Sequence, residues 1–176
     1  MEPIILHPHP EPFNFIDKWR HPLWKKCGVY LWTIEHRSAY LANYAGQCFK
    51  GGSNFERRIW QEYKWWASGR DWPVDIEQYK RGVRVILPAR PAGHTQRELA
   101  ELMPLYRLWL MPLEAQDQCD QAERWLVAEL CKDPVTRQFL ANRNPERYRP
   151  DPNWPVEIDA PPTFRVIGLT APASNT

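Results

Sequence analysis

Two short, mostly apolar runs near the start of the chain flank a polar segment. The runs GVYLWTI (28–34) and YLANYAG (40–46) lie on either side of EHRSA (35–39). Two strand-like runs with a short polar connection between them predict an antiparallel hairpin. Two sets of side chains should each share one face of their strand: Tyr30, Trp32 and Ile34 in the first, and Tyr40, Ala42 and Tyr44 in the second.

The segment after the hairpin has the start, stop and period of a helix. A capping-box pattern, Ser53-Asn54-Phe55-Glu56, opens it, and Ser68-Gly69 supplies the stop. Arg58 and Glu62 should lie together on one stripe, one turn apart. The neighbouring stripe recurs at helical spacing and is predicted to be buried: Phe55, Ile59, Tyr63 and Trp66.

The rest of the chain contains further candidate elements. They are a strand at 83–87, a helix opened by a second capping box at 95–98 and ended by Pro104, a buried strand at 106–113, a helix at 117–131 with Cys119, Ala122, Leu126 and Leu130 as its apolar stripe, a helix capped by Asp133, and a strand at 163–169. Together they predict an α/β fold with a small, mostly antiparallel central sheet flanked by helices. We divide the chain into an N-terminal arm (1–26), a central domain (27–149) and a Pro-rich C-terminal extension (150–176).

Composition narrows the choice of partner without fixing it. The net charge is only +2, so contact with a polyanion would need a local basic face rather than an overall positive charge. The ten Trp either build the core or offer stacking platforms for bases. One basic segment fits either a phosphate-tracking face or plain solvated charge: Arg137, Arg143, Arg147 and Arg149.

Cysteine spacing and apolar runs exclude several classes. Cys27, Cys48, Cys119 and Cys131 form no CxxC pair or Cys/His cluster, which argues against a zinc site or a thioredoxin-like redox pair. No run approaches the ~20 apolar residues of a membrane span. The N-terminus does not read as a secretory leader. We therefore expect a reduced, cytoplasmic protein without membrane association.

Four features follow one another in a fixed order: GVY at 28–30, YAG at 44–46, Arg58 on the first helix and Glu123 on a late helix. This set resembles the GIY-YIG nuclease superfamily over roughly residues 27–145. The segment NFERRIW is similar to the family's Asn-Leu-x-x-Arg segment, and AERWLVAEL to its Glu-x-x-Leu-Ile segment. The resemblance implies a metal-dependent endonuclease that hydrolyses DNA phosphodiester bonds.

Phosphodiester hydrolysis needs a positioned water, positive charge on the phosphate and a stabilised leaving oxygen. Arg58 offers a planar set of donors that matches phosphate oxygens. Glu123 is a hard oxygen ligand for one Mg²⁺ or Mn²⁺ ion. By resemblance, Tyr30 orients or deprotonates the attacking water and Tyr44 lines the site. A tyrosine needs a cationic neighbour to act as a base, and Arg58 is the candidate neighbour.

The chain departs from the family at two positions. Glu62 stands where relatives usually have His or Tyr, and it is either a base itself or the partner of Arg58 in a surface salt bridge. Gln47 stands where several relatives have lysine, for which Lys50 is a nearby substitute. These departures concern proton transfer more than the binding of phosphate and metal.

Four residues are candidates for binding the substrate: Lys50, Arg57, Asn142 and Asn144. The two asparagines either hold a backbone phosphate or cap a turn. Two alternatives to a nuclease stay open. One is a catalytically degenerate GIY-YIG-like module that binds nucleic acid, and the other is an unrelated module whose aromatic surface docks a protein.

Overall fold

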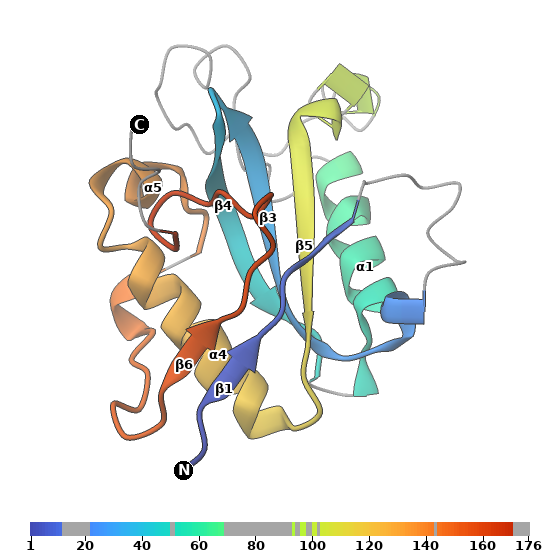
Figure 1. The fold of residues 1–176 in the computed structure, drawn as a ribbon. Helices are drawn as coiled ribbons and strands as arrows, with labels where there is room; N and C mark the ends of the chain where they lie inside the picture. The colour runs from blue at the N-terminus through green and yellow to red at the C-terminus, as the bar shows by residue number, and fades with distance from the viewer. Residues whose placement is uncertain are drawn as a thin grey trace.

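The computed structural model describes residues 1–11, 22–49, 52–68, 93, 96–97, 100–101, 103–142 and 144–170. At its centre is a four-stranded antiparallel sheet with the strand order β2-β5-β3-β4 (Figure 1). Its strands are β2 (His9–Glu11), β3 (Gly28–His36), β4 (Ala39–Gln47) and β5 (Tyr106–Pro112). The predicted hairpin and the predicted strand at 106–113 are therefore confirmed, and β4 forms one edge of the sheet.

Helices cover both faces of this sheet (Figure 1). α1 (Phe55–Ala67) packs on one face, where Phe55 and Ile59 meet Trp32 and Leu108. α4 (Gln116–Leu130) lies on the other face, and α5 (Pro134–Phe139) follows it near β4. Because helices bury both faces, β3 is apolar almost throughout rather than alternating. The predicted α/β class with an antiparallel central sheet is confirmed.

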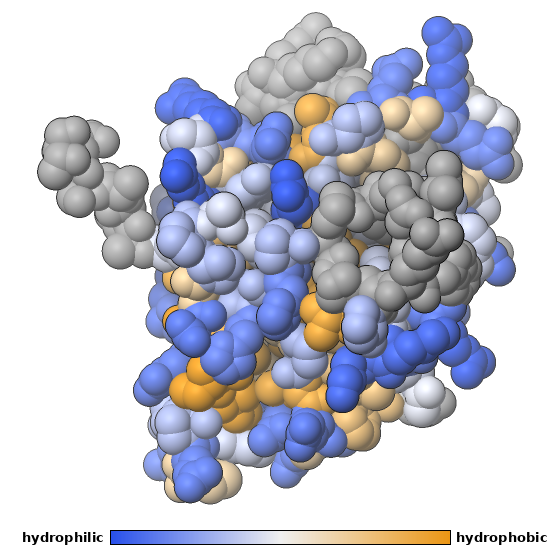
Figure 2. Space-filling view, turned by 45° about the vertical axis from the view of Figure 1, so that its right-hand side comes forward, coloured by the Kyte–Doolittle hydropathy of each residue, from blue (hydrophilic) through white to orange (hydrophobic). Residues whose placement is uncertain are grey.

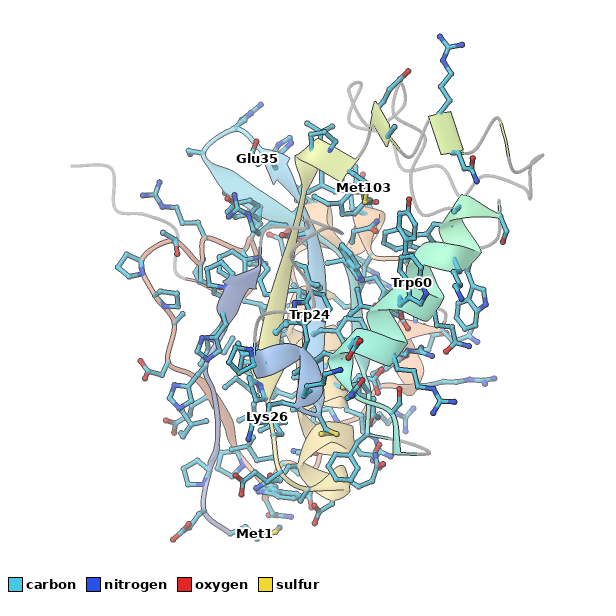
Figure 3. The ribbon with its side chains drawn as sticks, turned by 90° about the vertical axis from the view of Figure 1, so that its right-hand side faces the viewer. Met1, Trp24, Lys26, Glu35, Trp60 and Met103 are labelled. Carbon is cyan, nitrogen blue, oxygen red and sulfur yellow. The ribbon has the colours of Figure 1, made fainter. Side chains whose placement is uncertain are left out.

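The terminal segments pair with the domain and with each other. β1 (Ile4–Leu6) pairs in parallel with β6 (Val156–Ile158) to form a small second sheet beside α4. The 3₁₀ turn η2 (Pro22–Lys25) packs beside the first turns of α1, with Trp24 buried (Figure 3). Two further 3₁₀ turns are η4 (Met103–Leu105) and η5 (Pro145–Arg147).

The predicted strand at 163–169 is wrong. Apart from two isolated bridges, Tyr40 to Val166 and Ile167 to Thr170, these residues form turns and irregular backbone. Their apolar side chains instead pack on the core, where Phe164 meets Trp109 edge-on. The strand of this extension is β6, which the Pro-rich sequence around it concealed.

A bulge in β4 overturns the predicted sharing of a face by Tyr40, Ala42 and Tyr44. Trp32 pairs with Tyr44, but the next residue, Thr33, pairs with Ala42, so Asn43 is an extra residue in β4. Tyr40 and Ala42 therefore pack with the α4 core, whereas Tyr44 packs on the α1 side. The bulge carries Tyr44 to the face on which Tyr30 lies.

Helix α1 differs in two details from its sequence prediction. Its N-cap is Asn54, whose side chain accepts a hydrogen bond from the Arg57 amide at 3.0 Å, rather than Ser53. Its buried stripe contains Glu62 in place of Tyr63, which is only half-buried. The spacing Phe55, Ile59, Glu62, Trp66 follows the helical period, so a carboxylate occupies a core position.

Helices α4 and α5 match their predictions closely. Asp133 caps α5 by accepting hydrogen bonds from the amides of Val135 and Thr136.

All four cysteines are free thiols. The predicted strand at 83–87 lies outside the described residues, as do Thr95 and Glu98, the two capping residues of the predicted box at 95–98.

No helix in the described ranges combines the length and the apolar character that crossing a membrane requires. Hydrophilic side chains cover most of the described part of the face in Figure 2, with small apolar areas between them.

Candidate functional site

The site lies at the C-terminal end of β4, where α1 and α4 approach from opposite faces of the sheet. A pocket of about 370 Å³ opens there. It is lined by Gln47 and Cys48 at the end of β4, by Ser53, Arg57, Arg58 and Gln61 before and along α1, and by Glu123 of α4. Because β4 is an edge strand, residues from both faces of the sheet reach one pocket. The structure thus brings the predicted Arg58 and Glu123 together.

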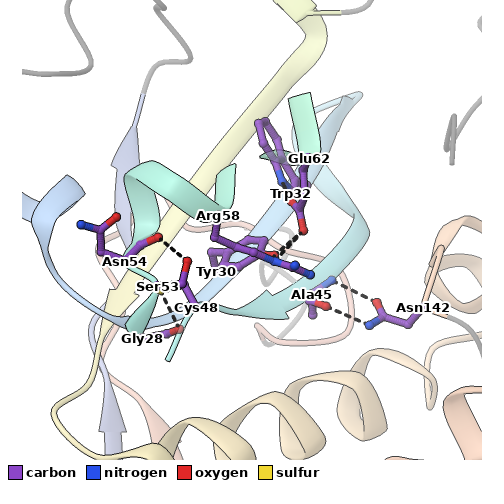
Figure 4. A network of polar contacts seen from close by, with 10 residues as sticks. All are labelled: Gly28, Tyr30, Trp32, Ala45, Cys48, Ser53, Asn54, Arg58, Glu62 and Asn142. Atoms are coloured by element: carbon purple, nitrogen blue, oxygen red, sulfur yellow. Dashed lines mark hydrogen bonds and ion pairs between the residues drawn. The ribbon is translucent and has the colours of Figure 1, made fainter. Parts of the chain in front are cut away.

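Beneath this pocket is a buried polar group, the Tyr30 cluster, made of Tyr30, Trp32, Arg58 and Glu62 (Figure 4). The Tyr30 hydroxyl donates to Glu62 Oε1 and accepts from Arg58 Nε at 3.1 Å. Trp32 Nε1 donates to Glu62 Oε2 at 3.0 Å, and Arg58 Nε lies 3.4 Å from Glu62 Oε1. Both carboxylate oxygens of Glu62 therefore have donors, and the guanidinium of Arg58 is fixed from below.

Burial sets the protonation of this cluster. Tyr30 is fully buried, and burial followed by the nearby Glu62 carboxylate raises the pKa of its hydroxyl well above the usual value. Burial raises the pKa of Glu62 to about 7, against the lowering effects of the Tyr30 hydrogen bond and the Arg58 charge. Glu62 is only 4% exposed, so its interpretation as a surface salt bridge does not hold. Tyr30 is neutral at ordinary pH.

Tyr44 lies next to this cluster. Its ring centroid is 6.2 Å from that of Tyr30, and burial raises the pKa of its hydroxyl as well. The structure thus brings the two predicted tyrosines together through the bulge in β4.

Two motif glycines make room for these contacts. Gly46 pairs with Tyr30 across the hairpin, and a Cβ at Gly46 would lie 2.4 Å from the Tyr30 hydroxyl oxygen. A Cβ at Gly28 would lie 2.2 Å from the carbonyl oxygen of Met111 and 2.8 Å from the ring of Phe55. Any larger residue would displace Tyr30 or separate β3 from its neighbours.

On the α4 side, a second group forms the Gln47 cluster, made of Gln47, Gln116, Asp120 and Glu123. Gln47 Nε2 donates to Asp120 Oδ1 at 2.6 Å and to Glu123 Oε2 at 2.8 Å. Gln116 Nε2 donates to Gln47 Oε1 at 2.9 Å and to Asp120 Oδ1 at 3.1 Å. The Gln47 amide thus orients Glu123, the predicted metal ligand.

A second pocket of about 280 Å³ adjoins the first. Both pockets are lined by Gln47 and Glu123. The remaining wall of the second comes from Asp120 and Arg124 of α4 and from Asn144, Arg147 and Tyr148 around η5. Glu123 therefore belongs to the wall of both pockets.

The donor set around Glu123 fits a hard divalent ion of the Mg²⁺ or Mn²⁺ type. Mg²⁺ commonly takes one or two protein carboxylates and keeps several waters, and Glu123 and Asp120 supply such carboxylates one helical turn apart. Across the described ranges, no group of three or more His, Cys, Asp or Glu side chains is placed to enclose an ion. An ion here would need substrate oxygens or waters to complete its coordination.

The predicted substrate-binding residues separate in the structure. Arg57 is exposed and lines the first pocket, and Asn144 is exposed and lines the second. Asn142 is buried: its side-chain amide accepts from Ala45 N at 3.0 Å and donates to Ala45 O at 2.8 Å (Figure 4). Asn142 therefore completes the edge of β4 rather than facing a pocket. Lys50 lies outside the described residues.

Sequence reasoning missed several residues of the site. Trp32 was predicted to share a face with Tyr30, but its hydrogen bond to Glu62 was not foreseen, because Glu62 was considered only as a base or as the partner of Arg58 in a surface salt bridge. Asp120 lies one turn before Glu123, a helical spacing that would have paired the two carboxylates. No sequence motif pointed to Arg124 and Tyr148, which line the second pocket.

No protein-family model, curated protein or solved structure matches this chain.

Proposed function

We propose that this protein is a metal-dependent endonuclease of the GIY-YIG type that hydrolyses DNA phosphodiester bonds. One observation carries the proposal: Arg58 and Glu123, from helices on opposite faces of the sheet, line the same pocket at the edge of β4. A guanidinium and a carboxylate facing one cavity match the needs of a phosphate and a divalent ion.

In this proposal Arg58 binds the scissile phosphate. Its Nε–H is engaged by Tyr30, and the guanidinium has further N–H donors for phosphate oxygens. A donor fixed before the substrate arrives stabilises developing charge without reorganisation. The Tyr30 cluster supplies this fixation through the hydroxyl of Tyr30 and the carboxylate of Glu62.

Glu123, with Asp120 beside it, would hold the ion. A bound divalent ion supplies positive charge against the phosphate and the leaving alkoxide. Gln47 keeps the Glu123 carboxylate turned toward the pocket by donating to Oε2.

Tyr30 and Glu62 act as positioning residues in this account. Neither side chain lines the pocket, and the Tyr30 hydroxyl is held by both Arg58 and Glu62. The raised pKa of Tyr30 also opposes its use as a base. The sequence-based expectation that Tyr30 deprotonates the water is therefore replaced here by a role in orienting Arg58.

A plasmid-nicking assay tests this function. Supercoiled DNA and labelled single- and double-stranded oligonucleotides are incubated with Mg²⁺, with Mn²⁺ or with EDTA. We expect metal-dependent nicking that Arg58→Ala and Glu123→Ala each slow by about 100-fold or more. Arg165→Ala is the matched control, because it removes an exposed arginine that lines neither pocket, and it should leave the nicking rate within about twofold of the wild type.

The second candidate function is a nucleic-acid-binding module that has lost cleavage. The specific observation in its favour is the Gln47 amide, which donates to oxygens of both carboxylates that an ion would use. In the same assay this module would show salt-dependent binding of the oligonucleotides without nicking in either metal. Binding without nicking in the folded wild-type protein would contradict the proposed endonuclease function.

A further inference from the structure

The second pocket carries an arrangement that the proposed cleavage reaction does not use. Arg124 follows Glu123 on α4, and Arg147 belongs to η5, yet both line this hollow together with Asn144. Both arginines are exposed. Two guanidinium groups and an amide around one cavity form a set of donors suited to phosphate oxygens.

The wall around η5 is fixed by contacts elsewhere in the fold. Asn142 joins the chain just before η5 to Ala45 of β4 through two hydrogen bonds. Gln121 of α4 binds the chain beyond η5, donating to the carbonyls of Asp151 at 2.9 Å and Trp154 at 2.7 Å. Arg147 is therefore presented from a segment fastened at both ends, as a preorganised binding wall requires.

The two pockets share the Glu123 carboxylate, and each has arginines of its own. Arg57 and Arg58 line only the first pocket, whereas Arg124 and Arg147 line only the second, which Asp120 also lines. The shared carboxylate suits an ion, and the arginines of each pocket suit phosphates. Successive phosphates of one nucleic-acid strand lie one nucleotide apart, so they suit two pockets that share lining residues.

We infer that the second pocket binds the phosphate next to the scissile one on the same nucleic-acid strand, through Arg124 and Arg147. This inference rests on the proposed function, because it takes the Arg58 pocket as the place of the scissile phosphate. It gives the protein a contact with the strand backbone beside the cut as well as at it.

Binding measured without cleavage tests the pocket. Fluorescence anisotropy of labelled single-stranded and duplex oligonucleotides is followed in EDTA over a range of salt concentrations. We expect the R124A/R147A protein to lose about tenfold in affinity at moderate salt, with a salt slope smaller by about 1 for the lost phosphate contact. A 5′-mononucleotide at equal concentration should not displace the strand.

The matched control is R137A/R165A, which removes the same charge from two exposed arginines that line neither pocket. It should stay within about twofold of the wild type if the contact is local. Equal losses in both double variants, no loss in R124A/R147A, or displacement by the mononucleotide would each overturn the inference.

The two proposals fail in different ways. If the wild type nicks DNA and R124A/R147A binds as tightly as the wild type, the inference fails and the nuclease stands. If R124A/R147A weakens binding but the wild type never nicks DNA, the endonuclease proposal is wrong and phosphate binding at the second pocket is supported.

Discussion

Two glutamates at the edge of β4 occupy opposite environments. Glu62 of α1 is buried in the Tyr30 cluster and accepts from Tyr30 and Trp32, with Arg58 beside it. Glu123 of α4 is half-buried in the Gln47 cluster and lines both pockets. Each lies on a helix and bonds to a side chain of the β3–β4 hairpin. They differ in access to solvent.

The burial of a carboxylate decides whether it can orient neighbouring side chains or bind an ion. A carboxylate without access to the pocket can orient its neighbours but cannot bind an ion. If it is removed, the groups that donate hydrogen bonds to it lose a buried acceptor. A carboxylate on the pocket wall, such as Glu123, is accessible to an ion that enters the pocket. We therefore expect stability to depend mainly on Glu62 and ion-dependent chemistry mainly on Glu123.

The largest stability effect should come from Glu62→Ala. This change leaves the Tyr30 hydroxyl and the Trp32 N–H without their acceptor and Arg58 without its counter-ion, so we expect a loss of about 3 kcal/mol in the free energy of unfolding. Urea denaturation measures it. Glu62→Gln keeps an acceptor and the side-chain volume and should lose less. A Glu62→Ala protein as stable as the wild type would contradict the buried cluster.

The second effect is on the pH dependence of stability. The Glu62 pKa is about 7 in the fold against the ordinary value of 4.5, so the folded state holds this proton more tightly than the unfolded chain. Protonation of Glu62 therefore adds to the free energy of unfolding. This stabilisation is fully present below about pH 4.5 and is lost as the pH rises through 7. Between pH 5 and 7.5 the wild type should lose about 2 kcal/mol more than Glu62→Gln. Parallel pH profiles would refute the raised pKa.

The smallest stability effect should come from Glu123→Gln. The side chain faces the pocket, and a glutamine carbonyl can still accept from Gln47, so the free energy of unfolding should change by less than about 1 kcal/mol. The same denaturation series measures it, with Glu62→Gln as the buried counterpart. A loss larger than that of Glu62→Gln would reverse the proposed division between the two carboxylates.

Much of the fold could be predicted from the sequence because its local signals agree with one another. The hairpin, β5, α4 and α5 all appear where the apolar period and the caps placed them. The missed features depend on tertiary contacts. The extra residue Asn43 in β4 is fixed by Tyr106 and by Phe139 of α5, and β6 forms by pairing with β1 across almost the whole chain.

For the site, the sequence allowed several residues to be predicted, but not their burial or their hydrogen-bond partners. Arg58 and Glu123 were predicted to act together, and they line one pocket. Glu62 was expected beside Arg58, but its burial depends on packing against Trp32 and Tyr30, which no helical period reveals. Asn142 looked like a phosphate ligand, yet the open edge of β4 takes up its amide.

The most direct test of the account is a double-mutant cycle on metal-dependent nicking. The rates of wild type, Arg58→Ala, Glu123→Gln and the double variant are compared at saturating DNA, with folding checked by denaturation. Because both residues act on one phosphate in one pocket, the double variant should be about as slow as the slower single variant. Losses that multiply, or a wild type that does not nick DNA with any divalent ion, would contradict the account.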